Sequence, residues 1–385
     1  MPFVDNLQQV PLDPIFELQA AYLADSRPEK VNLGIGLYAD RQGHTFVFPV
    51  VQAAFRIVNV DDFEYKPIGG NRNFLNELTK FVLGAEINLD EIAQQATCGG
   101  TQACRIFGDL IAQDEQKRQM YIGVPTWGNH FAVLKSLELQ SFPHLDSNGL
   151  VNLDSYLNVV NSAPEGSVLL LHGGLTHNPT GHNLSIEDLK NVLPILEQRK
   201  MGLFIDAAYT GLGEGLKQDL DWLRYAWETV TDVAIGFSLS KNASLYEHRA
   251  GVLLLKTKRK TALESQLQKL ARESVSMAPG IPQEMILNIL ESETWTQQWV
   301  MELEAARQDL LERKTTLLTA LPPQFHNLKD AHGMFALLPL SKEQIDRLQT
   351  EFAIYIPPNG RINFGGLKMS DIPKIAQAIR AVTSE

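Results

Sequence analysis

The sequence predicts an α/β protein: a large domain with a mostly parallel central sheet covered by helices, plus a smaller α+β domain built from the N- and C-terminal segments. The middle of the chain alternates short β-rich runs with longer helical patterns. Several short runs, such as VLLL at 168–171 and GVLLL at 251–255, are continuously apolar rather than alternating. Such strands are covered on both faces, which favours a mostly parallel sheet between layers of helices.

The elements of the large domain follow from this alternation, taken in chain order. We expect strands ending at Thr97 and over Met120–Val124, Ser167–His172, Gly202–Asp206, Val233–Leu239 and Gly251–Lys256. Between them we expect helices over Gln102–Gln113, His130–Leu139, Ile186–Arg199 and Leu220–Thr229.

After about residue 260 the pattern changes to a long charged helical stretch from Pro282 to Leu321, which Pro322 and Pro323 stop. A second set of elements follows: a strand at 334–340, a helix at 342–352, strands at 354–356 and 361–364, and a last helix. The first 45 residues are too few to fold alone, so they should pack with this C-terminal part. The predicted division is residues 1–45 and 301–385 for the small domain and residues 46–300 for the large domain.

Composition excludes several function classes. The chain of 385 residues is 44% hydrophobic and 21% charged, as in an ordinary globular protein, and its net charge of -11 leaves no basic footprint for nucleic acid. Two cysteines cannot make a disulfide scaffold, and nothing near them is spaced like a metal site. No apolar run approaches the length of a membrane span. Asp5, Pro11 and Asp13 occupy the place where a signal peptide needs its apolar core, so a cytoplasmic protein is expected.

Lys241 is the first candidate for chemistry, in the segment SLSKNASLYEHRAG. A lysine in such a turn is most often simply solvated. Its neighbours favour another interpretation, because Ser238, Ser240 and Arg249 offer hydroxyls and a fixed cation for a phosphate beside a reactive amine. Partial desolvation would lower the pKa of such an amine and make it a nucleophile.

Asp206 ends an apolar strand in GLFIDAAYTG, where the carboxyl edge of a parallel sheet places ligand-binding groups. A carboxylate there either caps the next turn or holds a protonated ring nitrogen of a cofactor. Tyr209 would face the same site. Asn178, in HNPTG, would present its amide at the end of the preceding strand.

Three further segments supply binding groups. Gly100 and Thr101 begin a helix directly after a strand, which is typical of a phosphate cradle, although the spacing is not that of a P-loop. Trp127, in PTWGNH, could stack on a planar ring. Arg361, in PPNGRINFGG, suits bidentate binding of a substrate carboxylate.

Together, and in this order, these segments resemble the class I aminotransferases of fold type I, which use pyridoxal 5′-phosphate (PLP), and most closely the aspartate/aromatic aminotransferase branch. The resemblance runs nearly end to end, through NLGIGLYAD, EYKPIGG, GGTQA, PTWGNH, HNPTG, FIDAAYTG, SLSKNASLYEHRAG, GMF and GRINFGG. The SLSKN…LYEHRAG and HNPTG segments are its most specific parts.

The resemblance implies a role for each matched residue. Lys241 would be the Schiff-base lysine and the proton carrier, Asp206 the partner of the pyridine nitrogen, and Tyr209 with Asn178 the partners of the ring oxygen. Trp127 would stack on the ring, with His130 behind it. The implied phosphate site comprises Gly100, Thr101, Ser238 and Arg249, with Ser240 nearby and Tyr65 from a neighbouring subunit. A homodimer with shared sites is therefore expected.

The implied substrate site consists of Gly36, Trp127, Asn178, Arg272 and Arg361. Arg361 would clamp the α-carboxylate, and Arg272 would cross the dimer to bind a side-chain carboxylate. Two arginines at opposite ends of a pocket select dicarboxylates, so the leading hypothesis is ping-pong amino transfer between an aspartate- or glutamate-type L-amino acid and a 2-oxo acid such as 2-oxoglutarate.

Three alternatives stay open at this point. An aromatic-amino-acid aminotransferase would use the same two arginines, a PLP lyase or decarboxylase could share the fold, and a non-catalytic binder could have kept it. The segment SVSMAPG after Arg272 departs from the usual pattern of the branch, and HGGLTHNPTG is one residue longer than its usual form, which leaves the role of His172 unassigned.

Overall fold

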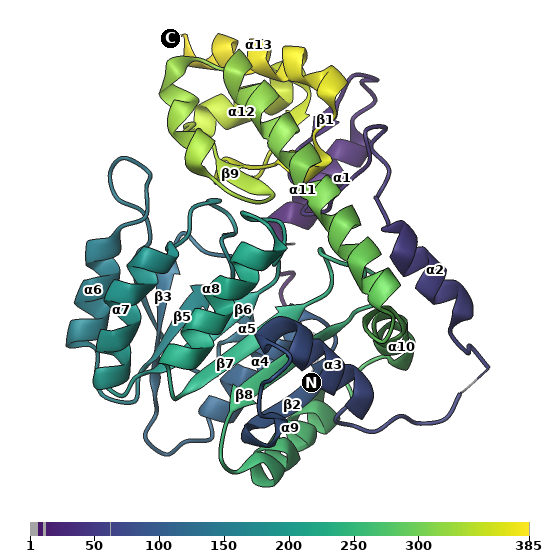
Figure 1. Ribbon diagram of the computed structural model, residues 1–385. Helices are drawn as coiled ribbons and strands as arrows, with labels where there is room; N and C mark the ends of the chain where they lie inside the picture. The colour runs from purple at the N-terminus through teal and green to yellow at the C-terminus, as the bar shows by residue number, and fades with distance from the viewer. Residues whose placement is uncertain (1–6, 11–12, 62, 385) are drawn as a thin grey trace.

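A seven-stranded sheet forms the centre of the protein in the computed structural model, which describes residues 7–10, 13–61 and 63–384 (Figure 1). Asp5 and Pro11 of the predicted 1–45 segment lie outside the described residues. The strand order is β2-β8-β7-β6-β5-β3-β4, and β8 is antiparallel to both of its neighbours while the other pairs are parallel. The predicted mostly parallel sheet is confirmed. Its strands are β2 (Ile92–Thr97), β3 (Gln119–Val124), β4 (Glu138–Pro143), β5 (Val168–His172), β6 (Gly202–Ala207), β7 (Val233–Ser238) and β8 (Gly251–Lys256).

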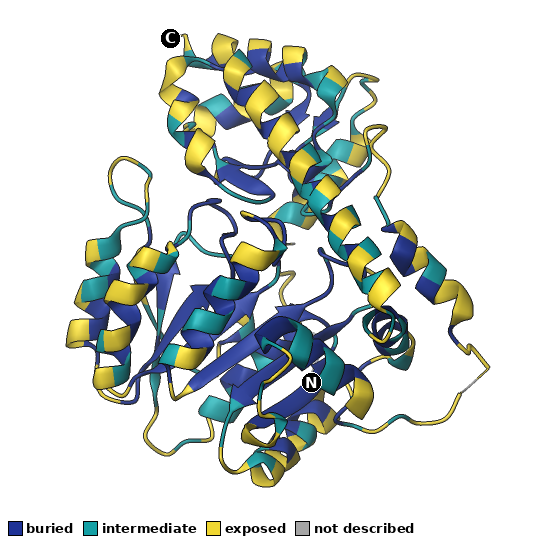
Figure 2. Cartoon of the chain, viewed as in Figure 1, coloured by how far each residue is buried: buried dark blue, intermediate teal, exposed yellow. Residues whose placement is uncertain are grey.

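Helices cover both faces of this sheet, and its central strands are dark blue, buried ribbons in Figure 2, whereas β3 and β4 at one edge are partly exposed. Leu169 and Leu171 of β5 belong to one apolar cluster, whereas Val168 and Leu170 belong to the cluster on the opposite face. This alternation explains why the strand sequences are continuously apolar. One face carries α3 (Arg72–Leu83), α6 (Leu153–Ser162), α7 (Ile186–Gln198) and α8 (Leu216–Thr229), and the other carries α4 (Gly100–Ile111), α5 (His130–Val133) and α9 (Lys260–Ser274).

Two predicted elements are wrong in extent. The helix expected over His130–Leu139 stops at Val133, and the chain then forms β4, which pairs with β3 alone at the edge of the sheet. An edge strand is partly solvated, so it mixes polar and apolar residues. Such a mixture lacks the continuous apolar run of a buried strand and therefore resembles the pattern of an amphipathic helix. The stretch from Pro282 to Leu321 is two helices, α10 (Gly280–Leu290) and α11 (Glu293–Ala320), because the Ser292 side chain caps a new helix.

A smaller α+β module lies beyond the carboxyl edge of the sheet, and the N-terminal segment belongs to it (Figure 1). We call the small module the set α1 (Pro14–Ala24), β1 (Val31–Asn32), β9 (Phe335–Leu337), α12 (Lys342–Phe352), β10 (Ile354–Tyr355), β11 (Arg361–Asn363) and α13 (Ile372–Thr383). β1 pairs in parallel with β10, and β9 pairs antiparallel with β11. The remaining elements are α2 (Pro49–Ile57), η1 (Leu89–Glu91), η2 (Pro323–Asp330), η3 (Phe364–Gly366) and η4 (Met369–Asp371). The domain ranges 1–45, 46–300 and 301–385 stay a prediction, and their second boundary falls inside α11.

Arg313 of α11 joins the helix to the N-terminal segment and to η3. Its side chain is 1% exposed, and its guanidinium donates to the carbonyl oxygens of Gly365, Leu367 and Ala39 at 2.9 to 3.0 Å. It also pairs with Asp309, four residues earlier, at 2.5 Å. No helix among the described residues is both long and apolar enough to cross a membrane.

Replacing Arg313 should therefore destabilise the fold. Arg313→Met leaves buried carbonyls without donors and should lower the free energy of unfolding by about 3–5 kcal/mol, as for other broken buried ion pairs. Urea unfolding followed by circular dichroism measures this. The control is Arg105→Met, because Arg105 pairs with Asp109 at the same i,i+4 spacing but is 41% exposed, so its loss should cost less than about 1 kcal/mol. Equal losses in both variants would contradict the anchoring role.

Candidate active site

The carboxyl ends of neighbouring strands bring the predicted residues to one cavity. His172 at the end of β5 is in register with Asp206 of β6, and Asp206 is in register with Gly236 of β7. The cavity has an empty volume of about 580 Å³. It is lined by Gly100, Thr101, Trp127, His172, Asn178, Asp206, Ala208, Tyr209, Ser238, Ser240, Lys241 and Arg249. Every residue predicted to bind the cofactor lies in this lining except Tyr65.

One end of the cavity is an anion cradle. The N-terminus of α4 opens there, with Gly99 at φ +79° as its N-cap. Arg249 donates to the Ser240 hydroxyl at 3.2 Å and to the Cys98 carbonyl at 2.9 Å, and the Ser238 hydroxyl donates to Ser240 at 3.1 Å. A Cβ at Gly99 would lie 2.8 Å from the Arg249 guanidinium, so glycine lets the helix terminus approach the cation. The helix dipole, two hydroxyls and a guanidinium suit a phosphate group.

Asp206 also lines the cavity, and one of its carboxylate oxygens has no partner among the described residues. The residue is 6% exposed, and its Oδ2 lies 3.1 Å from His130 Nε2. Its Oδ1 is buried and has no hydrogen-bond partner among the described residues. A buried carboxylate oxygen is costly to leave unpaired, so this geometry suits an N–H donor supplied by a ligand.

A chain of side chains holds His130 against Asp206. His130 Nδ1 lies 2.9 Å from the Thr126 hydroxyl, which lies 3.0 Å from His172 Nε2. The His172 ring packs on His177, and their centroids are 4.0 Å apart. Burial lowers the pKa of His172 and of His177 well below the usual range, so both rings are neutral. Sequence reasoning missed Thr126, although it directly precedes Trp127 in PTWGNH, and the structure brings the unassigned His172 into the lining.

The Lys241 amine lies in the cavity above the rings of Tyr209 and Tyr246, 5.4 and 5.8 Å from their centroids. Burial lowers its pKa from 10.5 to about 8, and the Arg249 cation adds to this effect. An amine with such a pKa is partly unprotonated near neutral pH, so it can act as a nucleophile or a base.

Asn178, Tyr209 and Arg361 form a second hydrogen-bonded group. Asn178 Nδ2 donates to the Tyr209 hydroxyl at 3.1 Å, and Arg361 donates to Asn178 Oδ1 at 3.2 Å. Burial raises the pKa of Tyr209, so its hydroxyl stays protonated and can donate. Arg361 is 4% exposed, its Nε has no partner, and no acidic side chain of the described residues lies within salt-bridge distance. A buried guanidinium with unused donors suits a carboxylate ligand.

Gly36 approaches the same region from the small module. A Cβ added to Gly36 would lie 3.5 Å from the Phe335 ring, and the Arg361 guanidinium lies 4.7 Å from the centroid of that ring. Glycine therefore leaves room beside Arg361.

Tyr65 and Arg272 are not brought to the cavity within one chain. Tyr65 is 88% exposed. Arg272 is exposed in the last turn of α9, where its guanidinium donates to the Ser276 hydroxyl. Their predicted roles require a second copy of the chain and stay predictions.

Among the described residues, one group of three metal-ligand types is clustered: Cys104, His130 and Asp206, with ligand atoms within 4.8 Å of one another. Burial and the Asp206 carboxylate raise the pKa of the Cys104 thiol well above its usual range. A protonated thiol is a poor metal ligand, so these three residues suit a metal ion less well than they suit a ligand N–H group that donates to Asp206.

The family model "Aminotransferase class I and II" matches residues 28–379, and the chain belongs to this family. The resemblance inferred from the motifs is confirmed. The chain is 34% identical to a tyrosine aminotransferase of Rhizobium meliloti over 383 residues, which cover 97% of this chain and 98% of that relative. It is 33% identical to a mitochondrial aspartate aminotransferase of Arabidopsis thaliana over 395 residues, which cover 98% of this chain and 91% of that relative.

Among solved structures, the aromatic-amino-acid aminotransferase of Burkholderia pseudomallei, covalently bound to pyridoxal phosphate, superimposes with a TM-score of 0.95. The two sequences are 30% identical, and the match covers 99% of this chain and 100% of that one.

The low pKa of Lys241 can be tested directly on cofactor-free protein. Labelling of Lys241 by an amine-selective reagent should be half-maximal near pH 8 and should fall about tenfold per pH unit below it, because only the unprotonated amine reacts. Peptide mass spectrometry across pH 6–11 measures this. In Arg249→Met the midpoint should move to higher pH, since a repelling cation is removed. A midpoint near the ordinary lysine value of about 10.4 in the unmodified chain would contradict the electrostatic account.

Proposed function

We propose that this chain is a PLP-dependent aminotransferase that exchanges the amino group of an aspartate- or glutamate-type L-amino acid with a 2-oxo acid such as 2-oxoglutarate, by a ping-pong mechanism. The observation that carries the proposal is one cavity that combines the Lys241 amine, the unpartnered Asp206 oxygen and the anion cradle of Arg249, Ser240 and the α4 N-terminus. An amine, a ring-nitrogen acceptor and a phosphate site are the three features that PLP requires.

The residues of the cavity fit this cofactor. The cradle would hold the phosphate, Asp206 Oδ1 would accept from the ring nitrogen, and Trp127 would stack on the ring. Tyr209 and Asn178 would bind the ring oxygen. When bound, PLP supplies an aldehyde that takes up the amino group and a ring that withdraws electrons.

The chain's own residues would carry the proton and orient the substrate. The Lys241 Nζ, with a pKa of about 8, can take a proton from the substrate Cα and return it, because its pKa lies near neutral pH. The unused donors of Arg361 would bind the α-carboxylate. The chain of His130, Thr126 and His172 would hold Asp206 in place through one carboxylate oxygen and leave the other available to the cofactor.

We further propose that the enzyme is a cytoplasmic homodimer with shared sites. Tyr65 would reach the phosphate of the partner's cofactor, and Arg272 would bind the side-chain carboxylate in the partner's site. The exposure of both side chains in a single chain supports this arrangement.

A second candidate is transamination of aromatic amino acids. A cavity of about 670 Å³ adjoins the first and shares Trp127 and Asn178 with it. The lining also contains Asp13 but is mainly apolar. Its apolar side chains are Pro14, Ile15, Trp127, Pro179, Pro357 and Pro358. An apolar wall beside Arg361 would accept an aromatic side chain.

Lys241→Ala tests the proposed function. The variant should lose the absorbance of covalently held PLP and at least about 10³-fold in kcat, since both the amine and the proton carrier are gone. Borohydride treatment of the unmodified protein followed by mass spectrometry should place the cofactor mass on Lys241. The exposed Lys258→Ala serves as the control and should behave as the unmodified protein. Cofactor mass on another lysine would refute the assignment.

Arg272→Ala tests substrate selection. It should lower kcat/KM for aspartate about 10–100-fold, the usual value of a hydrogen bond to a charged group, with a much smaller effect for phenylalanine. Steady-state rates with both amino acids measure this. Equal losses for both substrates would argue against a side-chain clamp.

Mixing two variants tests whether Arg272 acts across a dimer. Lys241→Ala and Arg272→Ala chains, unfolded and refolded together, form mixed dimers in which one of the two sites keeps both intact residues. Aspartate activity should therefore reappear on mixing. If the chains are shown to form mixed dimers and aspartate activity does not return, Arg272 and Lys241 act in the site of the same subunit.

A further inference from the structure

Asp219 is a buried carboxylate that forms no ion pair with the described residues. It lies in the first turn of α8 and is 0% exposed. Its Oδ2 accepts from the backbone N–H groups of Gly211 at 2.7 Å and Gly213 at 3.0 Å, and its Oδ1 accepts from Glu214 at 3.1 Å. Three backbone donors therefore fix the turn at 211–214 on the end of α8.

The same carboxylate borders a second loop. A Cβ added to Gly174 would lie 3.2 Å from Asp219 Cβ, and one added to Gly213 would lie 2.6 Å from Asp219 Oδ1 and 2.8 Å from the Leu175 carbonyl oxygen. The loop after β5 and the turn after Tyr209 thus meet at Asp219, so close that glycine is needed on both sides.

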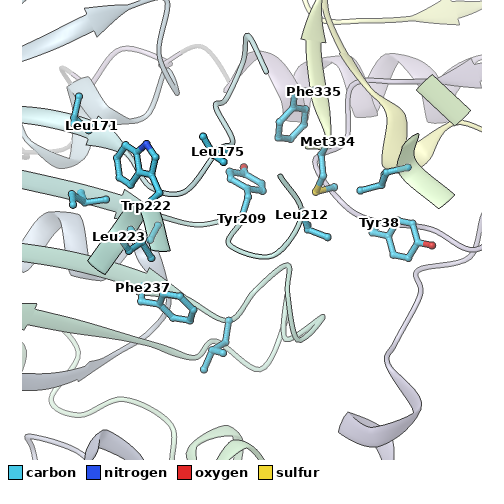
Figure 3. Close-up of a cluster of buried hydrophobic side chains, with 14 of the residues drawn as sticks. Tyr38, Leu171, Leu175, Tyr209, Leu212, Trp222, Leu223, Phe237, Met334 and Phe335 are labelled. Atoms are coloured by element: carbon cyan, nitrogen blue, oxygen red, sulfur yellow. The ribbon is translucent and has the colours of Figure 1, made fainter. Parts of the chain in front are cut away.

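These two segments carry the hydrogen-bonded pair of the site. Tyr209 precedes Gly211 by two residues, and Asn178 follows Leu175 by three. Tyr209, Leu175 and Leu212 lie in one apolar cluster, between Trp222 of α8 and Phe335 of the small module (Figure 3). The Tyr209 ring meets Phe335 edge to face, with centroids 5.4 Å apart. A displacement of the 211–214 turn would therefore move Tyr209 within a close-packed cluster.

No cation of the described residues lies within salt-bridge distance of Asp219. Arg307 of α11 interacts electrostatically with both Asp219 and Glu214 of the turn, and it pairs with Glu304 at 2.7 Å. Burial raises the pKa of Asp219 to about 6, which the backbone N–H groups partly offset. The carboxylate is thus ionised at neutral pH and is stabilised by backbone N–H groups of the turn at 211–214 and of Leu175.

We propose that Asp219 is a positioning residue of the active site: through the turn at 211–214 and the loop at 173–175 it sets the Tyr209 hydroxyl against Asn178. The proposal rests on the proposed function, in which that hydroxyl donates to the ring oxygen of the cofactor. Asp219 touches neither substrate nor cofactor and acts through Tyr209.

Asp219→Asn removes the charge and turns one acceptor into a donor that faces backbone N–H groups. We expect kcat to fall about 10–100-fold, the usual cost of a misplaced active-site group. The pH at which the absorbance of bound cofactor changes should rise by about one to two units, because an oxygen that loses a donor holds its proton more tightly. Asp221→Asn on the same helix is the matched control, since Asp221 is a surface residue paired with Lys217, and should change neither value.

A double-mutant cycle separates positioning from general destabilisation. If Asp219 acts through Tyr209, Asp219→Asn should lower kcat by less than about twofold in a Tyr209→Phe background, because the coupled effect is already lost. The same 10–100-fold loss in both backgrounds would overturn the proposal. Gly213→Ala presses on the same contact with the carboxylate intact and should reproduce the absorbance shift if Asp219→Asn does not fold.

Hydrogen exchange of the cofactor-free protein tests the anchor independently of catalysis. Asp219→Asn should speed exchange at the amides of Gly211, Gly213 and Glu214 at least about tenfold, as for a lost hydrogen bond of 1.4 kcal/mol, and Asp221→Asn should not. Unchanged exchange at these amides would overturn the proposal even in an active aminotransferase. Faster exchange in a protein that transaminates nothing would instead refute the proposed function and support the anchor.

Discussion

The half-satisfied carboxylate of Asp206 is the constraint around which the site is built. A buried carboxylate is stable only when hydrogen bonds or a cation compensate its lost hydration. Here a chain through His130, Thr126 and His172 satisfies one oxygen, and the other has no hydrogen-bond partner among the described residues. Because the histidines beyond His130 are held neutral by burial, they supply no competing cation. A ligand can supply the missing donor, and a protonated ring nitrogen suits this oxygen.

Apart from Asp13, which lines the adjoining cavity, the remaining charged side chains of the site are positive, although the whole chain carries -11. Arg249 lies at the cradle, Lys241 in the middle and Arg361 toward the small module. This excess of cations attracts an anionic cofactor and an anionic substrate, and it also lowers the pKa of Lys241. Arg249 thus contributes to both binding and reactivity, because the guanidinium that suits a phosphate also adds to burial, the larger cause of the low pKa of Lys241.

The apolar runs in the sequence predicted which site residues lie at the carboxyl ends of the parallel strands. Asp206, Ser238 and Asn178 follow apolar runs, and parallel strands place such residues together. β4 was missed because an edge strand lacks the continuous apolar signal. The Thr126–His172 contact and the three backbone bonds to Asp219 join residues that no periodicity relates, so they emerge only from tertiary packing. Tyr65 and Arg272 lie outside the cavity of one chain, and their assignment depends on the family resemblance alone.

The hydrogen bond between Arg361 and Asn178 joins the small module to the sheet across the substrate region. In the ligand-free chain Arg361 donates to the amide oxygen of Asn178, which is a weaker acceptor than a carboxylate. A substrate carboxylate can take over that donor and use the unpaired Nε as well. Arg361 belongs to β11, and the segment that follows β11 is bonded to α11 through Arg313 and the carbonyls of Gly365 and Leu367. A force on the Arg361 guanidinium is therefore transmitted to the small module as a whole. With the roles proposed for Arg361 and Lys241, substrate binding energy would help to close the module over the cofactor, which favours the exclusion of water before proton transfer.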